Sequence, residues 1–102
     1  MLNEDLRKKI EGQVKGDRIV VYMKGTAQMP QCGFSAQVVH ILNKHGKTFK
    51  TYNILEDDAL RQGMKEFTNW PTFPQVYVDG KFVGGCDIVS DLEQRGELKN
   101  ML

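Results

Sequence analysis

Apolar residues recur at helical spacing in four parts of the chain, and each recurrence predicts an amphipathic helix. Gly16 and Gly46 follow the first two of these patterns and are typical of the residue at which a helix stops. The segment 97–102 is expected to form a last short helix or a frayed end. The apolar positions are Leu2, Leu6, Ile10 and Val14; Phe34, Val38, Ile41 and Leu42; Leu60, Met64 and Phe67; and Ile88, Val89 and Leu92.

Shorter apolar runs between these helices predict the strands. The run Ile19–Met23 is continuous and rich in β-branched residues, which favours a central strand covered on both faces. The segment 49–54 predicts a second strand, joined to the first by a parallel crossover through a helix. Residues 75–78 and 81–83 flank Asp79-Gly80, a strong signal for a two-residue hairpin turn. The predicted fold class is therefore α/β, with a four-stranded mixed sheet flanked by helices.

Composition and charge narrow the class of protein. With 102 residues, 40% of them hydrophobic, the chain fits one domain, 1–102, with one core. A net charge of +1, with acids and bases interspersed, argues against nucleic-acid binding. No apolar run approaches the roughly 20 residues that span a bilayer. The early acids do not match a signal or transit peptide, so we expect a cytoplasmic protein, or an organelle-matrix protein if a transit peptide has been removed.

The segment Cys32-Gly33-Phe34-Ser35 carries the candidate chemistry. A second thiol at the position of Ser35 would resolve a mixed disulfide internally, so without it Cys32 needs an outside thiol or acts as a metal ligand. Its place at a predicted helix start, near Lys24, favours the thiolate. The alternative is an inert buried cysteine, which the flanking Gln31 and Gly33 argue against. Ser35 either donates a hydrogen bond toward the sulfur or is an ordinary first-turn residue.

Three further motifs accompany this segment, in a fixed order along the chain. They are Lys24-Gly25-Thr26, Trp70-Pro71-Thr72-Phe73-Pro74-Gln75 and Gly84-Gly85-Cys86-Asp87. Together with Pro30 and the Cys32 segment, they resemble the successive signatures of single-domain monothiol glutaredoxins, over nearly the whole chain. The order of the elements likewise resembles the thioredoxin fold.

The resemblance implies a binding site for glutathione and assigns parts of it to residues of this chain. It implies that Lys24 binds glutathione, that Arg61 holds its glycine carboxylate, and that Cys86, through its backbone, and Asp87 hold its γ-glutamyl end. It also implies a cis Pro74 after Thr72, which exposes the Phe73 backbone to the cysteinyl part of glutathione. The implied binding residues are Lys24, Arg61, Thr72, Phe73, Pro74, Cys86 and Asp87.

The residues alone leave alternatives open for several of these positions. Lys24 and Arg61 could be solvated surface cations, and Asp87 could simply cap the last helix. The loop around Pro74 could be a mere kink. The two interpretations of Trp70, core residue or site residue, stay balanced. His40 and His45 are expected to be surface or helix-end residues, and a structural disulfide between Cys32 and Cys86 is disfavoured.

The number of cluster ligands that the chain can supply helps to distinguish the possible functions. A [2Fe-2S] cluster needs four ligands, and this chain offers Cys32 as its one well-placed thiol, both metal ligand and reactive group. The resemblance implies a homodimer that completes the set with two glutathione sulfurs. It also implies transfer of the cluster to apo iron-sulfur proteins and a BolA-like partner. A cluster carrier of this kind is expected to have weak or no oxidoreductase activity.

Two other functions use the same residues. The first is a glutathione-dependent oxidoreductase in which Cys32 removes glutathione from proteins. The second is a domain that only docks partners and does not need Cys32. Cys86 could replace glutathione as a ligand or resolve a disulfide of Cys32, although a cysteine at a helix start is more often structural.

Overall fold

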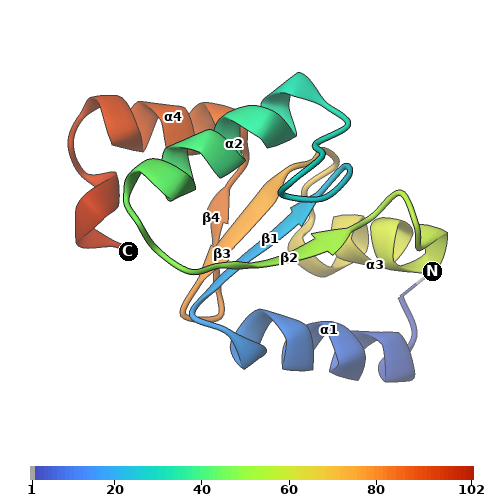
Figure 1. Ribbon diagram of the computed structural model, residues 1–102. Helices are drawn as coiled ribbons and strands as arrows, with labels where there is room; N and C mark the ends of the chain where they lie inside the picture. The colour runs from blue at the N-terminus through green and yellow to red at the C-terminus, as the bar shows by residue number, and fades with distance from the viewer. Residues whose placement is uncertain (1) are drawn as a thin grey trace.

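The sheet has the strand order β2-β1-β3-β4 in the computed structural model, which describes residues 2–102 (Figure 1). Strand β1 pairs in parallel with β2 and antiparallel with β3, and β3 pairs antiparallel with β4. This confirms the predicted mixed sheet with its first strand in the centre. The strands are β1 (Ile19–Met23), β2 (Lys50–Asn53), β3 (Gln75–Val78) and β4 (Lys81–Gly84), and the helices are α1 (Glu4–Gly16), α2 (Gly33–Lys44), α3 (Asp58–Thr68), α4 (Cys86–Gln94) and the 3-10 helix η1 (Leu98–Asn100).

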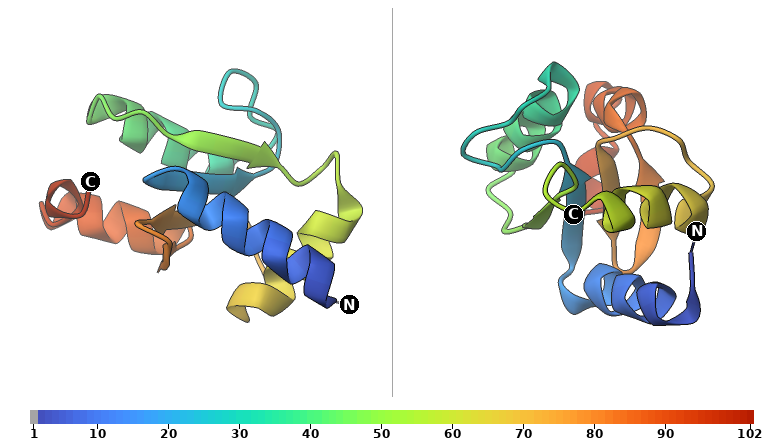
Figure 2. Two further views of the ribbon diagram at one scale, coloured as in Figure 1. Left: turned by 90° about the horizontal axis from the view of Figure 1, so that it is seen from below. Right: turned by 90° about the vertical axis from the view of Figure 1, so that its right-hand side faces the viewer.

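The helices form one layer on each face of the sheet. Helices α2 and α4 cover one face, and α1 and α3 cover the other (Figures 1 and 2). All five residues of β1 are buried, and their side chains alternate between the layers. Val21 packs in the core under α2 and α4, whereas Val20 and Tyr22 pack under α1 and α3. A continuous apolar run therefore supplies both cores.

The turn between β3 and β4 has the conformation that its sequence predicts. Asp79 has a φ of 53° and Gly80 a φ of 78°, so both central residues are left-handed, as a type I′ hairpin turn requires. The connection from β1 through α2 to β2 is the predicted parallel crossover, and α3 connects β2 to β3. Because β3 runs antiparallel to both β1 and β4, the ends of β1 and β4 and the start of β3 lie at one edge of the sheet.

One expectation about the helices is wrong, and one alternative that the sequence left open is decided. The spacing predicts Phe34 on the buried face of its helix, yet it is 63% exposed, because at the start of α2 it lines the open cavity described below. The C-terminal segment was left open between a short helix and a frayed end; it forms the short helix η1, and Leu98 and Leu102 are buried. The Arg18 guanidinium holds this segment by donating to the carbonyls of Met101, at 3.1 Å, and of Leu102.

The C-terminal ends of α2 and α4 are joined by polar contacts. His45 follows α2, and its Nε2 lies 2.7 Å from Glu93 Oε1 on α4. The hydrogen bond from His45 lowers the pKa of the Glu93 carboxyl, and Lys44 adds to this effect. His45 is thus a helix-end residue, as expected. No helix within residues 2–102 is long and apolar enough to cross a membrane.

Candidate thiol and ligand-binding site

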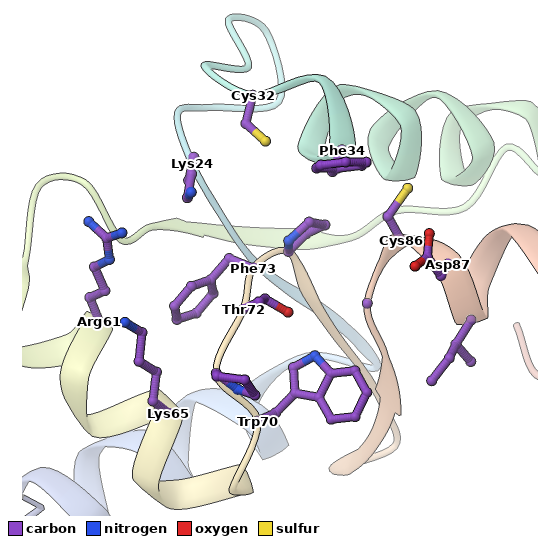
Figure 3. A pocket seen from close by; sticks show the side chains of 14 residues that line it. Lys24, Cys32, Phe34, Arg61, Lys65, Trp70, Thr72, Phe73, Cys86 and Asp87 are labelled. Carbon is purple, nitrogen blue, oxygen red and sulfur yellow. The ribbon is translucent and has the colours of Figure 1, made fainter.

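A cavity of about 500 Å³ opens at the sheet edge where β1 and β4 end and β3 begins. The N-terminal ends of α2 and α4 border it, together with α3 and the loop before β3 (Figure 3). The topology brings distant parts of the chain together here, because connections after β1 and β4 and before β3 all leave the sheet at this edge. All eight predicted site residues line it: Lys24, Cys32, Arg61, Thr72, Phe73, Pro74, Cys86 and Asp87.

A tight loop, residues 24–31, carries the chain from β1 to Cys32. Gly25 has a φ of +90°, and a Cβ atom there would lie 2.5 Å from the Met29 carbonyl oxygen, so the loop requires glycine. The Gly25 N–H donates to Asn53 Oδ1 at 2.9 Å, and the Gln31 N–H donates to the Lys24 carbonyl at 2.9 Å. These contacts fold the loop back and bring Cys32 near Lys24.

Cys32 is the N-cap residue of α2, and its side chain is directed into the cavity (Figure 3). The backbone N–H of Ser35 is the main group that lowers the pKa of the Cys32 thiol, and burial opposes it only in part. The Phe34 N–H, the Lys24 charge and the Ser35 hydroxyl also lower it. The helix start therefore stabilises the thiolate, in the direction predicted.

Ser35 also has a structural role. It is 0% exposed, and its Oγ accepts a hydrogen bond of 3.2 Å from the Lys24 N–H. It therefore ties the first turn of α2 to the end of β1, in addition to its effect on the sulfur.

Cys86 and Asp87 lie across the cavity from Lys24, in the first turn of α4. The N-cap of α4 is Gly85, which has no side chain to accept from the free N–H groups. Asp87 is exposed and makes no cap hydrogen bond, so the alternative of a simple capping residue is wrong. The Cys86 sulfur lies 3.8 Å from Ser90 Oγ, and both cysteines are free, as expected.

Three cationic side chains lie on the side of the cavity opposite Asp87. They are Lys24, Arg61 and Lys65 (Figure 3). The sequence analysis missed Lys65, although its position four residues after Arg61 places both on one face of α3 and could have identified it. Within residues 2–102, nothing accepts a hydrogen bond from the buried Nε of Arg61. The cavity is thus positive on one side and carries a carboxylate on the other.

The loop before β3 forms the floor of the cavity. The Phe73 side chain is buried in the core under α1 and α3, and the peptide bond between Phe73 and Pro74 is cis, as the resemblance implied. Trp70 is both a packing residue and a site residue: its ring lies 5.5 Å from that of Phe82, and it lines the cavity. Two exposed apolar side chains, Phe34 and Ile88, were also missed as lining residues.

The described residues do not form a metal site within one chain. Among residues 2–102, no group of three or more His, Cys, Asp and Glu side chains is placed to hold a metal ion. Cys32 at the start of α2 and Cys86 at the start of α4 are the two thiols of the chain. They are fewer than the four ligands that a [2Fe-2S] cluster needs.

Comparisons with known proteins agree with this geometry. The Glutaredoxin family model matches residues 19–83. The chain is 52% identical over 101 residues to a monothiol glutaredoxin of Synechocystis, covering 99% of this chain and 94% of that protein. Other relatives are named as mitochondrial and chloroplastic monothiol glutaredoxins.

Solved structures extend the likeness to three dimensions. Reduced poplar apo GrxS14 is 48% identical with a TM-score of 0.82, covering 93% of this chain and 87% of that one. A buckwheat glutaredoxin–glutathione complex is 27% identical with a TM-score of 0.84, covering 98% of this chain and 93% of that one.

Proposed function

The chain belongs to the glutaredoxin family as a monothiol member with the thioredoxin fold, and on that premise we propose that it binds glutathione and carries a glutathione-ligated [2Fe-2S] cluster to apo-proteins. The observation that carries this proposal is the single activated thiol, Cys32, between a cationic side and an acidic side of one cavity.

The polarity of the cavity matches the two ends of glutathione. The γ-glutamyl end is a zwitterion, and it fits the uncapped N–H groups of α4 together with the Asp87 carboxylate. The glycine end bears only a carboxylate, which fits the cationic side, where Arg61 Nε has no partner within residues 2–102. The complex of the buckwheat relative supports glutathione as the ligand. Between the ends, the cysteinyl part would lie near Phe73 and Cys32.

The cluster is cargo and not a resident cofactor. The residues of one chain fit it only if two chains share the cluster. One chain contributes the Cys32 thiolate, so a second chain and two glutathione sulfurs complete four ligands. A homodimer with exchangeable ligands suits delivery to apo iron-sulfur proteins. The family resemblance alone supports a BolA-like partner. The cytoplasmic location also stays a prediction, since relatives include mitochondrial and chloroplastic proteins.

A second function, glutathione-dependent thiol-disulfide exchange, is favoured by the lowered pKa of Cys32. The Cys32 thiolate would attack the glutathione sulfur of a glutathionylated protein, forming a Cys32–glutathione disulfide and releasing the protein thiolate. A second glutathione thiolate would then attack that disulfide, regenerating Cys32 and leaving oxidised glutathione. The buried Ser35 hydroxyl cannot take the place of the second thiol.

Anaerobic cluster reconstitution with and without glutathione tests the proposal. We expect visible absorption and a dimer on gel filtration only when glutathione is present, with one cluster and two glutathiones per dimer. A colourless monomer under both conditions would favour the oxidoreductase. A coloured dimer that forms without glutathione would indicate that Cys86, and not glutathione, supplies the remaining two sulfur ligands.

A further inference from the structure

Gln75, the first residue of β3, is a polar side chain at 0% exposure in an otherwise apolar strand. We propose that Gln75 is a positioning residue that orients the floor of the cavity for the cysteinyl part of glutathione. This inference rests on the proposed binding of glutathione and adds to it a residue that lies behind the cavity lining.

The side-chain amide of Gln75 bridges the core and the loop before β3. Its Nε2 donates to the carbonyl oxygens of Trp70 and Thr72, both at 3.2 Å. Its Oε1 accepts a hydrogen bond of 3.2 Å from the buried Tyr77 hydroxyl. Burying an amide is unfavourable unless its groups are paired, and here both donor hydrogens are used.

The composition of the loop explains why a side chain is needed for this contact. Pro71 and Pro74 have no backbone N–H, so the loop is poor in donors that could satisfy its own carbonyls. An apolar residue in place of Gln75 would fit the strand but would leave the inward carbonyls of Trp70 and Thr72 without these donors. The buried amide is thus explained by the loop rather than by the core.

The contact with Thr72 also sets the direction of the Phe73 N–H, a potential hydrogen-bond donor to the ligand. The Thr72 carbonyl and the Phe73 N–H belong to one trans peptide group, so they point in opposite directions. Because Gln75 holds that carbonyl toward the core, the Phe73 N–H is turned away from Gln75. Phe73 lines the cavity, so its N–H is oriented in advance for a backbone-like hydrogen bond with the ligand.

Tyr77 anchors Gln75 from the side of the core. Its ring is 5.6 Å from that of Tyr22 in an edge-to-face arrangement, and burial raises the pKa of its hydroxyl to about 12, so it remains a donor. Tyr77 does not line the cavity. Removing its hydroxyl would therefore break a hydrogen bond of the same Gln75 side chain without freeing the loop carbonyls, which provides a matched control.

Glutathione affinity, measured by calorimetry alongside the free energy of unfolding, tests the inference. Gln75→Met removes all three hydrogen bonds, whereas Gln75→Glu retains an acceptor for Tyr77 and, protonated in this buried place, can donate to at most one of the two loop carbonyls. We expect both to bind glutathione about tenfold more weakly, because the loop loses its preorganisation. The control Tyr77→Phe is expected to lower stability while its dissociation constant stays within about twofold of wild type.

The possible results are distinguishable. Wild-type affinity in both Gln75 variants would overturn the positioning role and leave the proposed function intact. No glutathione binding by the wild-type protein would overturn the proposed function, and this inference with it. If neither variant folds, hydrogen exchange of the wild-type Gln75 side-chain amide replaces them: we expect glutathione to slow it, and an unchanged rate would overturn the inference.

Discussion

Helices α2 and α4 both begin at the cavity with a cysteine, but the two helix starts are built differently. In α2 the cysteine is itself the N-cap, and no acidic residue follows in the first turn. In α4 the N-cap is Gly85, Cys86 is the first helical residue, and Asp87 is an acid in the first turn. The two cysteines therefore differ by one position relative to their helices.

This one-residue difference decides what each helix start can stabilise. A side chain at the N-cap lies against the free N–H groups, as a capping oxygen does, so the Cys32 sulfur receives their field and its pKa falls. A side chain one residue later does not cap, and a glycine N-cap leaves the N–H groups available to an external carboxylate. One helix start activates a thiol, and the other is suited to an α-amino-acid end.

Exchanging each sulfur for oxygen should have the largest effect on the difference between the two helix starts. We expect Cys32→Ser to lose cluster assembly completely and to change the free energy of unfolding by less than about 1 kcal/mol, because Ser is a good N-cap. Cys86→Ser, the matched control, is expected to retain the cluster, since its backbone is unchanged. Reconstitution absorbance and urea unfolding measure both, and equal losses in the two variants would contradict the comparison.

Adding a capping oxygen to α4 tests whether its open N–H groups bind ligand. Gly85→Ser is expected to weaken glutathione binding about tenfold, because the hydroxyl competes for those N–H groups.

The control for this change is Gly85→Ala, which shares the steric effect of a Cβ atom 3.1 Å from the Pro74 carbonyl but adds no oxygen. Calorimetry should show a smaller loss of affinity for Ala than for Ser. Equal losses would assign the whole effect to crowding.

Asp87→Asn sharpens the account of the same helix start. Removing the carboxylate is expected to weaken glutathione binding about fivefold, since the ligand ammonium loses its ion pair while the N–H groups remain. Asp91→Asn changes an exposed carboxylate of the same helix that is paired with Arg95 outside the cavity. That control should bind like wild type, and a loss as large as that of Asp87→Asn would point to net charge alone.

The pH dependence of Cys32 gives the smallest effect. Because its pKa is lowered, Cys32 stays ionised at pH values at which an ordinary cysteine is protonated. Alkylation therefore slows only as the pH falls through that lowered pKa. In a Cys86→Ser background, Lys24→Gln should move the rate profile to higher pH, because a positive charge is lost. The movement is expected to be small, since backbone N–H groups and not Lys24 dominate.

Lys99→Gln, which removes a charge outside the cavity, is the control for this measurement. A wild-type profile like that of a simple alkyl thiol would contradict the stabilisation of the thiolate by the helix start.

Much of the fold follows from local patterns that can be recognised in the sequence. The continuous run Ile19–Met23 predicts a central buried strand, and Asp79-Gly80 predicts the hairpin, because each signal depends on neighbouring residues alone. Phe34 shows the limit of this approach. Its spacing matches the buried face of α2, but at this end of the helix that face borders the open cavity, which no local pattern encodes.

Local patterns in the chain predict the helices and strands, the reactive Cys32 and the motifs shared with the family. Packing of the whole fold decides which groups share the cavity, how Lys65 joins Lys24 and Arg61, and how the buried Gln75 amide is paired. The difference is one of range. Helix periodicity and turn conformation depend on residues a few positions apart, whereas the polarity of a cavity and the pairing of a buried amide depend on segments brought together only by packing of the sheet and helices.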